Sequence, residues 1–154
     1  MKMIKVLVMA MVLSLPLMAR AELDNEAQIA MSNALGSGDI KVVQKFLKDG
    51  VDVNNTYFAW SGLQIAANHN QMKMVKFLID HGADVNYTHP VTRMTALSMA
   101  AFNGNEELVK YLISKGADVN AKLKDDANLV HALRDFGQDK TADLLVAAGA
   151  KEED

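Results

Sequence analysis

Three nearly identical strings decide the fold of this 154-residue chain: Gly50-Val-Asp-Val-Asn54, Gly82-Ala-Asp-Val-Asn86 and Gly116-Ala-Asp-Val-Asn120. A fourth glycine, Gly149, follows at the same interval, and the spacings between the four glycines are 32, 34 and 33 residues. A period of this length is typical of stacked supersecondary units that are each too small to bury their own apolar face. The sequence therefore predicts a solenoid, a class of protein that usually binds other molecules.

The residues between these glycines also repeat. Ser61-Gly-Leu-Gln-Ile-Ala-Ala67 aligns with Thr95-Ala-Leu-Ser-Met-Ala-Ala101 and, more loosely, with Asn128-Leu-Val-His-Ala-Leu-Arg134. Apolar residues three and four apart indicate the buried stripe of a helix, and the alanines allow close packing between neighbouring helices. The second helix of each unit is predicted from the apolar residues Val42, Val43, Phe46 and Leu47, then Met74, Val75, Leu78 and Ile79, then Leu108, Val109, Leu112 and Ile113.

Glycine or asparagine stands where each of these helices is expected to end, because both residues tolerate a left-handed backbone conformation. The predicted ends within the units are Gly38, Asn70, Gly104 and Gly137, and those after the second helices are Gly50, Gly82, Gly116 and Gly149. Asp39 is well placed to cap the second helix of the first unit.

The aligned strings resemble the ankyrin repeat, whose Thr-Pro-Leu-His-x-Ala-Ala signature opens the first helix of every unit. The resemblance covers almost all of the chain after residue 24 and implies an all-α ankyrin-repeat solenoid of four helix-turn-helix units with projecting finger loops. We expect an ankyrin-repeat domain over residues 22–154, with units at about 24–54, 55–86, 87–120 and 121–150. The first unit lacks the signature and the last carries Arg134 in place of an alanine, which indicates capping units with a polar outer face.

Residues 1–21 have the pattern of a signal peptide. Lys2 and Lys5 precede an apolar run from Val6 to Leu15, and Ala19-Arg20-Ala21 offers small residues at the two positions that a signal peptidase reads. An uncleaved membrane anchor would need about 20 apolar residues, and this run is too short. We therefore expect cleavage after Ala21, export to the periplasm and no stable membrane anchor afterwards.

Loss of the leader would leave 13 basic and 19 acidic residues, a net charge of -6. This acidic balance disfavours a nucleic-acid partner. The chain contains no cysteine, so stacking of the repeats must supply the stability that many exported proteins gain from disulfides. We expect a monomer when the protein is free.

The resemblance implies partner contacts in each finger before the signature and at the two residues after its Ala-Ala pair. The candidate partner-binding residues are Tyr57, Phe58, Trp60, Asn68, His69, Tyr87, His89, Arg93, Met94, Phe102, Asn103, Asp135 and Phe136. Six of the nine aromatic residues of the chain fall in this set, and aromatic side chains are common anchors of protein interfaces. The alternative for Phe58 and Trp60 is that they pack under their own finger.

The fingers of the second and third units differ in length. The finger that contains Thr88-His-Pro-Val-Thr-Arg93 is longer than the one before it by two residues. Arg93 offers a planar donor fork for carboxylates, and insertions in repeat proteins often lie on the binding face. A neutral change of length is the alternative.

No pattern in the chain indicates catalysis, a metal or a cofactor. A nucleophile elbow, a phosphate-binding glycine loop and a His-Glu-x-x-His motif are all absent from the sequence. His131 and His81 occupy repeat positions and are expected to be structural, and His69 and His89 have no second ligand at helical spacing. We therefore expect a binding protein that is not an enzyme.

The combination of a leader and an ankyrin solenoid resembles small exported bacterial ankyrin proteins with two described roles. One role is a self-protection or immunity protein that inhibits a resident peptidoglycan hydrolase, and the other is an accessory partner of a periplasmic catalase. An acidic solenoid with aromatic contacts suits a folded exported enzyme with a basic or apolar rim, so the sequence favours enzyme inhibition. Catalase support and an unspecified periplasmic adaptor remain the alternatives.

Overall fold

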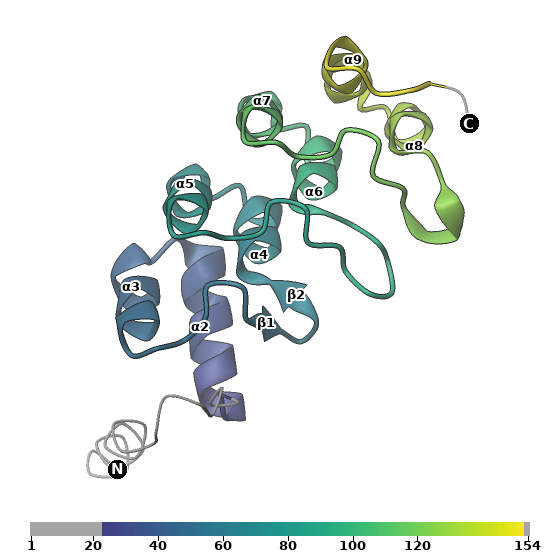
Figure 1. Ribbon diagram of the computed structural model, residues 1–154. Helices are drawn as coiled ribbons and strands as arrows, with labels where there is room; N and C mark the ends of the chain where they lie inside the picture. Colours follow the sequence, from purple (N-terminus) through teal and green to yellow (C-terminus); the bar gives the residue numbers. More distant parts are fainter. Residues whose placement is uncertain (1–22, 153–154) are drawn as a thin grey trace.

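The computed structural model describes residues 23–152 as a succession of helix pairs that runs from lower left to upper right in Figure 1, with loops projecting from one side. The predicted signal peptide lies outside these residues. The first pair consists of α2 (Asn25–Ser37) and α3 (Ile40–Lys48), and the others are α4 (Gly62–Asn68) with α5 (Met72–Asp80), α6 (Ala96–Phe102) with α7 (Glu106–Ser114), and α8 (Leu129–Asp135) with α9 (Asp139–Ala147). The prediction of an all-α solenoid of helix pairs is confirmed.

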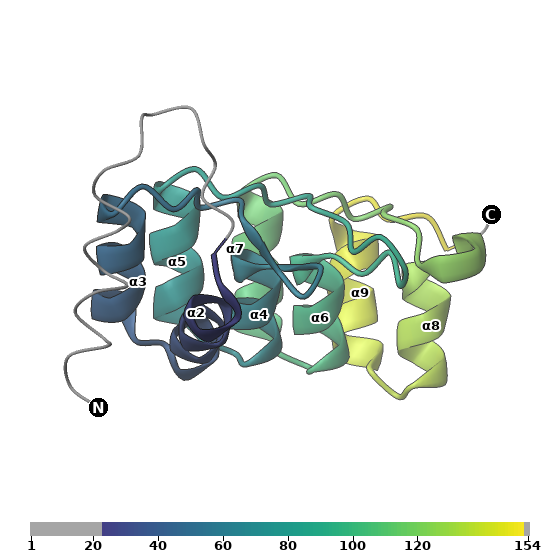
Figure 2. The same ribbon diagram turned by 90° about the horizontal axis from the view of Figure 1, so that it is seen from below.

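The helices form two rows. Figure 1 looks along most of the helix axes and shows α4, α6 and α8 in an inner row and α3, α5, α7 and α9 in an outer row. The loops extend sideways from the inner row, and Figure 2 shows that they lie at one end of the upright helices. We call these loops fingers one, two and three, which span residues 51–61, 83–95 and 117–128.

Two short elements occur within the fingers. Finger one contains a hairpin of β1 (Thr56–Tyr57) and β2 (Trp60–Ser61), which pair antiparallel with Tyr57 opposite Trp60. Finger three contains one 3-10 turn, η2 (Lys124–Asp126). The sequence predicted extended loops at these places without the strand pairing.

One continuous apolar core runs between the two rows, as the helical spacing predicts. The inner helices contribute Leu63, Leu97 and Leu133, which are 1% exposed or less. All of the predicted second-helix residues are buried or packed against this core. The signature alanines Ala66, Ala67, Ala100 and Ala101 are completely buried in this core, so each unit buries the apolar face of the next.

The helix boundaries follow the predicted capping chemistry. Asp39 accepts a hydrogen bond from the Val42 N–H at 3.3 Å, which confirms its predicted role at the start of α3. Asn70 ends its helix in the left-handed region with φ 56°, a conformation that asparagine tolerates better than most residues. All the glycines predicted at helix ends have positive φ values as well.

Asparagine side chains join the units along the finger side. Asn54 donates to the Gly82 carbonyl at 3.2 Å and accepts from the Asp84 N–H at 2.7 Å. Asn86 and Asn120 repeat this pair of bonds one and two units further on. We call this series the asparagine ladder. It explains why the Asp-Val-Asn strings repeat, because each one supplies a ladder asparagine.

The last unit is closed by an ionic cluster. Arg134 stands where the inner units have the second alanine of the signature, and its guanidinium lies 2.8 Å from Glu152, 3.1 Å from Asp143 and 3.7 Å from Asp139. Hydrogen bonds to Glu152 and Asp143 raise the pKa of Arg134 above its usual value. Replacement of the alanine therefore ties α8, α9 and the C-terminal segment together, in agreement with a capping unit.

Candidate protein-binding surface

Finger one presents an aromatic side chain on a tight turn. Phe58 and Ala59 connect the two strands with φ values of 53° and 71°, as in hairpin turns that require positive φ at both central residues. Such turns usually carry asparagine or glycine, so the backbone here is strained. Phe58 is 61% exposed at the tip of the hairpin.

The neighbouring Tyr57 has the opposite environment. Its side chain is 1% exposed and belongs to the core. Burial raises the pKa of the Tyr57 hydroxyl above its usual value, the nearby Asn55 side chain partly opposes this shift, and the charge of Asp52 adds to it. Although Asn55 is close enough to act on the pKa, the hydroxyl makes no well-formed hydrogen bond with the described residues.

Besides the asparagine ladder, two contacts connect finger two to finger one. The ring of Trp60 stacks on the ring of His89 with centroids 3.8 Å apart and an interplanar angle of 29°. The Tyr87 hydroxyl donates to the Ala59 carbonyl at 2.9 Å. Because Trp60 is half-buried by this stacking, it both contributes to the surface and holds two fingers together.

His89 organises the turn of finger two. It is 7% exposed, and its Nδ1 accepts hydrogen bonds from the Val91 and Thr92 N–H groups, both at 3.2 Å. The turn leaves Val91 66% exposed beside Pro90. Finger two therefore has an exposed apolar tip, and the buried His89 side chain holds the backbone of that tip in place.

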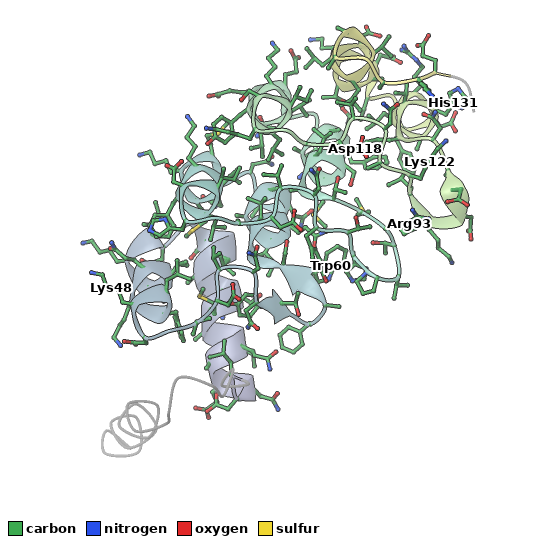
Figure 3. The ribbon with its side chains drawn as sticks, in the orientation of Figure 1. Lys48, Trp60, Arg93, Asp118, Lys122 and His131 are labelled. Carbon is green, nitrogen blue, oxygen red and sulfur yellow. The ribbon has the colours of Figure 1, made fainter. Side chains whose placement is uncertain are left out.

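Finger three is fastened to finger two in turn. Arg93 forms a 2.8 Å ion pair with Asp126, and the Lys124 N–H donates to the Thr92 carbonyl at 3.1 Å. Figure 3 shows Trp60 and Arg93 on adjacent fingers. The three fingers thus form a connected row. Binding of a partner therefore requires little further ordering of these loops.

A second row of candidate residues lies where the inner helices end. Phe102 and Phe136 meet edge to face with ring centroids 5.5 Å apart, and Phe136 is 74% exposed. The Asn103 side chain donates to the Asn68 carbonyl at 2.9 Å. We call the set Asn68, His69, Phe102, Asn103, Asp135 and Phe136 the helix-end row. The inner helices α4, α6 and α8 separate this row from the fingers by seven residues, or about 10 Å.

The structure corrects the predicted contact set at two positions. Tyr57 and His89 are buried because the strand and turn that carry them point these side chains inward, so neither can serve as a contact. Arg93 offers its fork to Asp126 of the same chain, its side chain is 49% exposed, and its contact with a partner stays a prediction. Met94 and Tyr87 are half-buried. The other members remain predictions, and the exposed Val91 joins them.

Sequence reasoning missed Gln64. This side chain is completely buried and donates to the Tyr87 and Met94 carbonyls of finger two at 3.3 and 2.6 Å. Its oxygen accepts the Ser61 N–H at 3.0 Å, which completes a capping box at the start of α4. The available signal was its place at the histidine of the signature, since a polar residue inside an apolar helix must find partners.

Two further features of the described part of the chain bear on function. Its histidines and carboxylates form no group of three that could hold a metal ion. None of its helices is both long and apolar enough to cross a bilayer.

Helix pairs, stacked units and an exposed row of fingers define a repeat solenoid of the protein-binding class. A family model described as ankyrin repeats matches residues 28–123 and 90–153. The chain belongs to the ankyrin-repeat family, and it is an ankyrin-repeat protein–protein interaction module.

Similar proteins include the ankyrin repeat, SAM and basic leucine zipper domain-containing protein 1 of several mammals. The Carollia perspicillata protein is 33% identical over 63 residues, which cover 40% of this chain and 13% of that protein. The Mus musculus protein is 32% identical over 63 residues, with the same coverage of 40% and 13%. The matched segments thus span about a seventh of these relatives.

Proposed function

We propose that this chain is an exported module that binds a folded enzyme and restrains its activity. The observation that carries the proposal is the distribution of exposed apolar side chains. Among residues 23–152, three of the four large exposed ones lie on the fingers or the helix-end row, namely Phe58, Val91 and Phe136. The fourth, Ile29, lies on α2. Exposed aromatic side chains are common anchors of protein interfaces.

The shape of this surface favours a folded partner. The connected fingers and the helix-end row flank the inner helices, so a raised rim of another protein can contact both rows at once. Covering the mouth of an active site in this way inhibits an enzyme without any chemistry by the inhibitor. Asp125 and Asp135 are exposed and favour a basic rim. A peptidoglycan hydrolase is the enzyme class that we propose, because an exported inhibitor of it would protect the producing cell.

Export is the first expected result. The charged start, apolar run and small cleavage residues of residues 1–21 should direct the chain to the periplasm, with removal after Ala21. Terminal sequencing of the protein from a periplasmic fraction should read Glu22 as the first residue. Recovery of the chain with Met1 intact from the cytoplasm would refute export.

Loss of the finger-one aromatic should weaken binding. Phe58→Asn keeps a residue that tolerates positive φ while it removes the exposed ring, so the fold should survive and partner affinity should fall about tenfold. The variant and the wild-type chain are immobilised and used to capture proteins from a periplasmic extract. The affinity of the captured enzyme is then measured by titration.

Lys110→Ala on the outer helix α7 is the matched control and should bind as the wild-type chain does. Trp60→Ala is a poorer test, because it also breaks the stacking on His89. The purified chain should lower peptidoglycan cleavage by the captured hydrolase in proportion to occupancy. Capture of a catalase, or full hydrolase activity at saturation, would refute inhibition, and equal affinity of Phe58→Asn would refute the surface.

A further inference from the structure

The outward sides of α3 and α5 carry a concentration of positive charge. Together the two helices contain five lysines and one acidic residue, Asp80, although the chain as a whole is acidic. All five lysine side chains are exposed, namely Lys41, Lys45, Lys48, Lys73 and Lys76. We call these five lysines the basic face.

Helical spacing places these side chains on one side of the molecule. Lys41, Lys45 and Lys48 are four and three residues apart, so they lie along one stripe of α3. Lys73 occupies the repeat position of Lys41 in α5, and Figures 1 and 2 show the two helices side by side. Packed helices have axes about 10 Å apart, so the lysines form a continuous face two helices wide.

Most of this charge is not neutralised inside the molecule. Lys45 forms an ion pair of 2.8 Å with Asp49. Within residues 23–152, Lys41, Lys48 and Lys73 form no ion pair. Three ammonium groups of the basic face are therefore available to an anion outside the chain.

Two of the lysines stand where they weaken their own helices. Lys41 and Lys73 are the second residues of α3 and α5, and the partial positive charge at the start of a helix disfavours a cation there. Helix α7 has Glu106 and Glu107 in its first turn, which is the favourable choice. Helix stability therefore does not account for Lys41 and Lys73, whereas binding of an external anion does.

The type of cation indicates the kind of anion. After residue 21 the chain has two arginines, Arg93 and Arg134, and both form ion pairs of defined geometry. The basic face consists of lysines alone, whose flexible and strongly hydrated ammonium groups suit a diffuse layer of negative charge better than a ligand of fixed shape. The anionic headgroups of a bilayer form such a layer, and their attraction increases with each lysine near the surface.

We propose that the basic face binds reversibly to the anionic headgroups of a phospholipid bilayer and holds the outer row of helices against the membrane. Figure 1 shows the outer row and the fingers on opposite sides of the inner row, and Figure 3 shows Lys48 directed away from Trp60 and Arg93. The fingers therefore remain accessible in the bound state. This inference goes beyond the proposed inhibition of an enzyme and does not depend on it.

The test measures co-sedimentation with vesicles and uses the chain from Glu22 onward. This part contains every described helix and omits the apolar run of residues 6–15, which would interact with a bilayer by itself. Vesicles of equal parts phosphatidylglycerol and phosphatidylcholine should bind half of the protein at about 1 mM lipid, because each lysine near an anionic surface strengthens binding about fivefold. Binding should be at least tenfold weaker to pure phosphatidylcholine, and also at about 500 mM salt, which screens the attraction.

The variant Lys41→Glu/Lys73→Glu should bind the anionic vesicles at least tenfold more weakly. Urea unfolding should show that it is at least as stable as the wild-type chain, because glutamate is favoured in the first turn of a helix. The control Lys124→Glu/Lys151→Glu makes the same charge change on finger three and the C-terminal segment, and its vesicle binding should stay within about threefold of wild type. A lipid with a nitroxide headgroup should broaden the amide NMR signals of α3 and α5 more than those of the fingers.

Equal losses of vesicle binding in the two variants, or stronger broadening of the finger signals, would overturn the proposal. Equal affinity for a short DNA duplex would overturn the assignment to a membrane. The variant Lys41→Glu/Lys73→Glu should still restrain the partner enzyme in solution, so failure of membrane binding and failure of the proposed function can be told apart.

Discussion

Gln64→Met should lower the free energy of unfolding by about 2 kcal/mol, although methionine has nearly the same size. The buried amide joins the start of α4 to finger two, and its loss leaves the Ser61 N–H and the Tyr87 carbonyl without their bonds. The Met94 carbonyl keeps a bond from the His89 N–H and is less affected. Unfolding in urea, followed by circular dichroism, measures the change.

Ser98→Ala is the matched control for this prediction. Ser98 occupies the same repeat position one unit later, but its hydroxyl bonds only to the Thr95 backbone within its own capping box. We expect a cost of about 1 kcal/mol, as for the loss of a cap alone. If both variants lose the same free energy, the bonds from Gln64 to finger two contribute nothing to stability.

Gly116→Val should cost about 2 kcal/mol through the backbone alone. Gly116 follows α7 with φ 86°, and a Cβ added there would meet no atom within 4 Å. The added Cβ is therefore not crowded, and the cost arises because a β-branched residue is strained at positive φ. Gly116→Asn adds a side chain that tolerates this conformation and should cost less than half as much. Equal unfolding free energies for the two variants would contradict this account.

The fold was predictable because its signals repeat. The interval between Gly50, Gly82, Gly116 and Gly149 fixes the unit, and each unit confirms the helical spacing of the others. Capping followed from residue type alone, as at Asp39 and Asn70. The period of the apolar residues therefore predicted the core and the helix pairs, and the types of the capping residues predicted the ends of the helices.

The candidate surface was predictable only as a region. Finger positions locate Tyr57, Phe58 and His89, but the directions of Tyr57 and Phe58 depend on a hairpin with positive φ at Phe58 and Ala59, and that of His89 depends on the turn of finger two. Neither Phe58 nor Ala59 is typical of such a hairpin turn, so the sequence gives no sign of it. The ion pair between Arg93 and Asp126 joins residues of different fingers and has no signal in either one alone.

The asparagine ladder joins consecutive units along one edge of the molecule. Each rung joins two consecutive units at the base of the fingers. At the opposite ends of the helices, Gln71 donates to the Gly36 carbonyl and Asn103 donates to the Asn68 carbonyl, so consecutive units are tied there as well. Polar bonds at both ends of the inner helices therefore set the spacing and orientation of neighbouring units, and with them the separation between the fingers and the helix-end row that a partner meets.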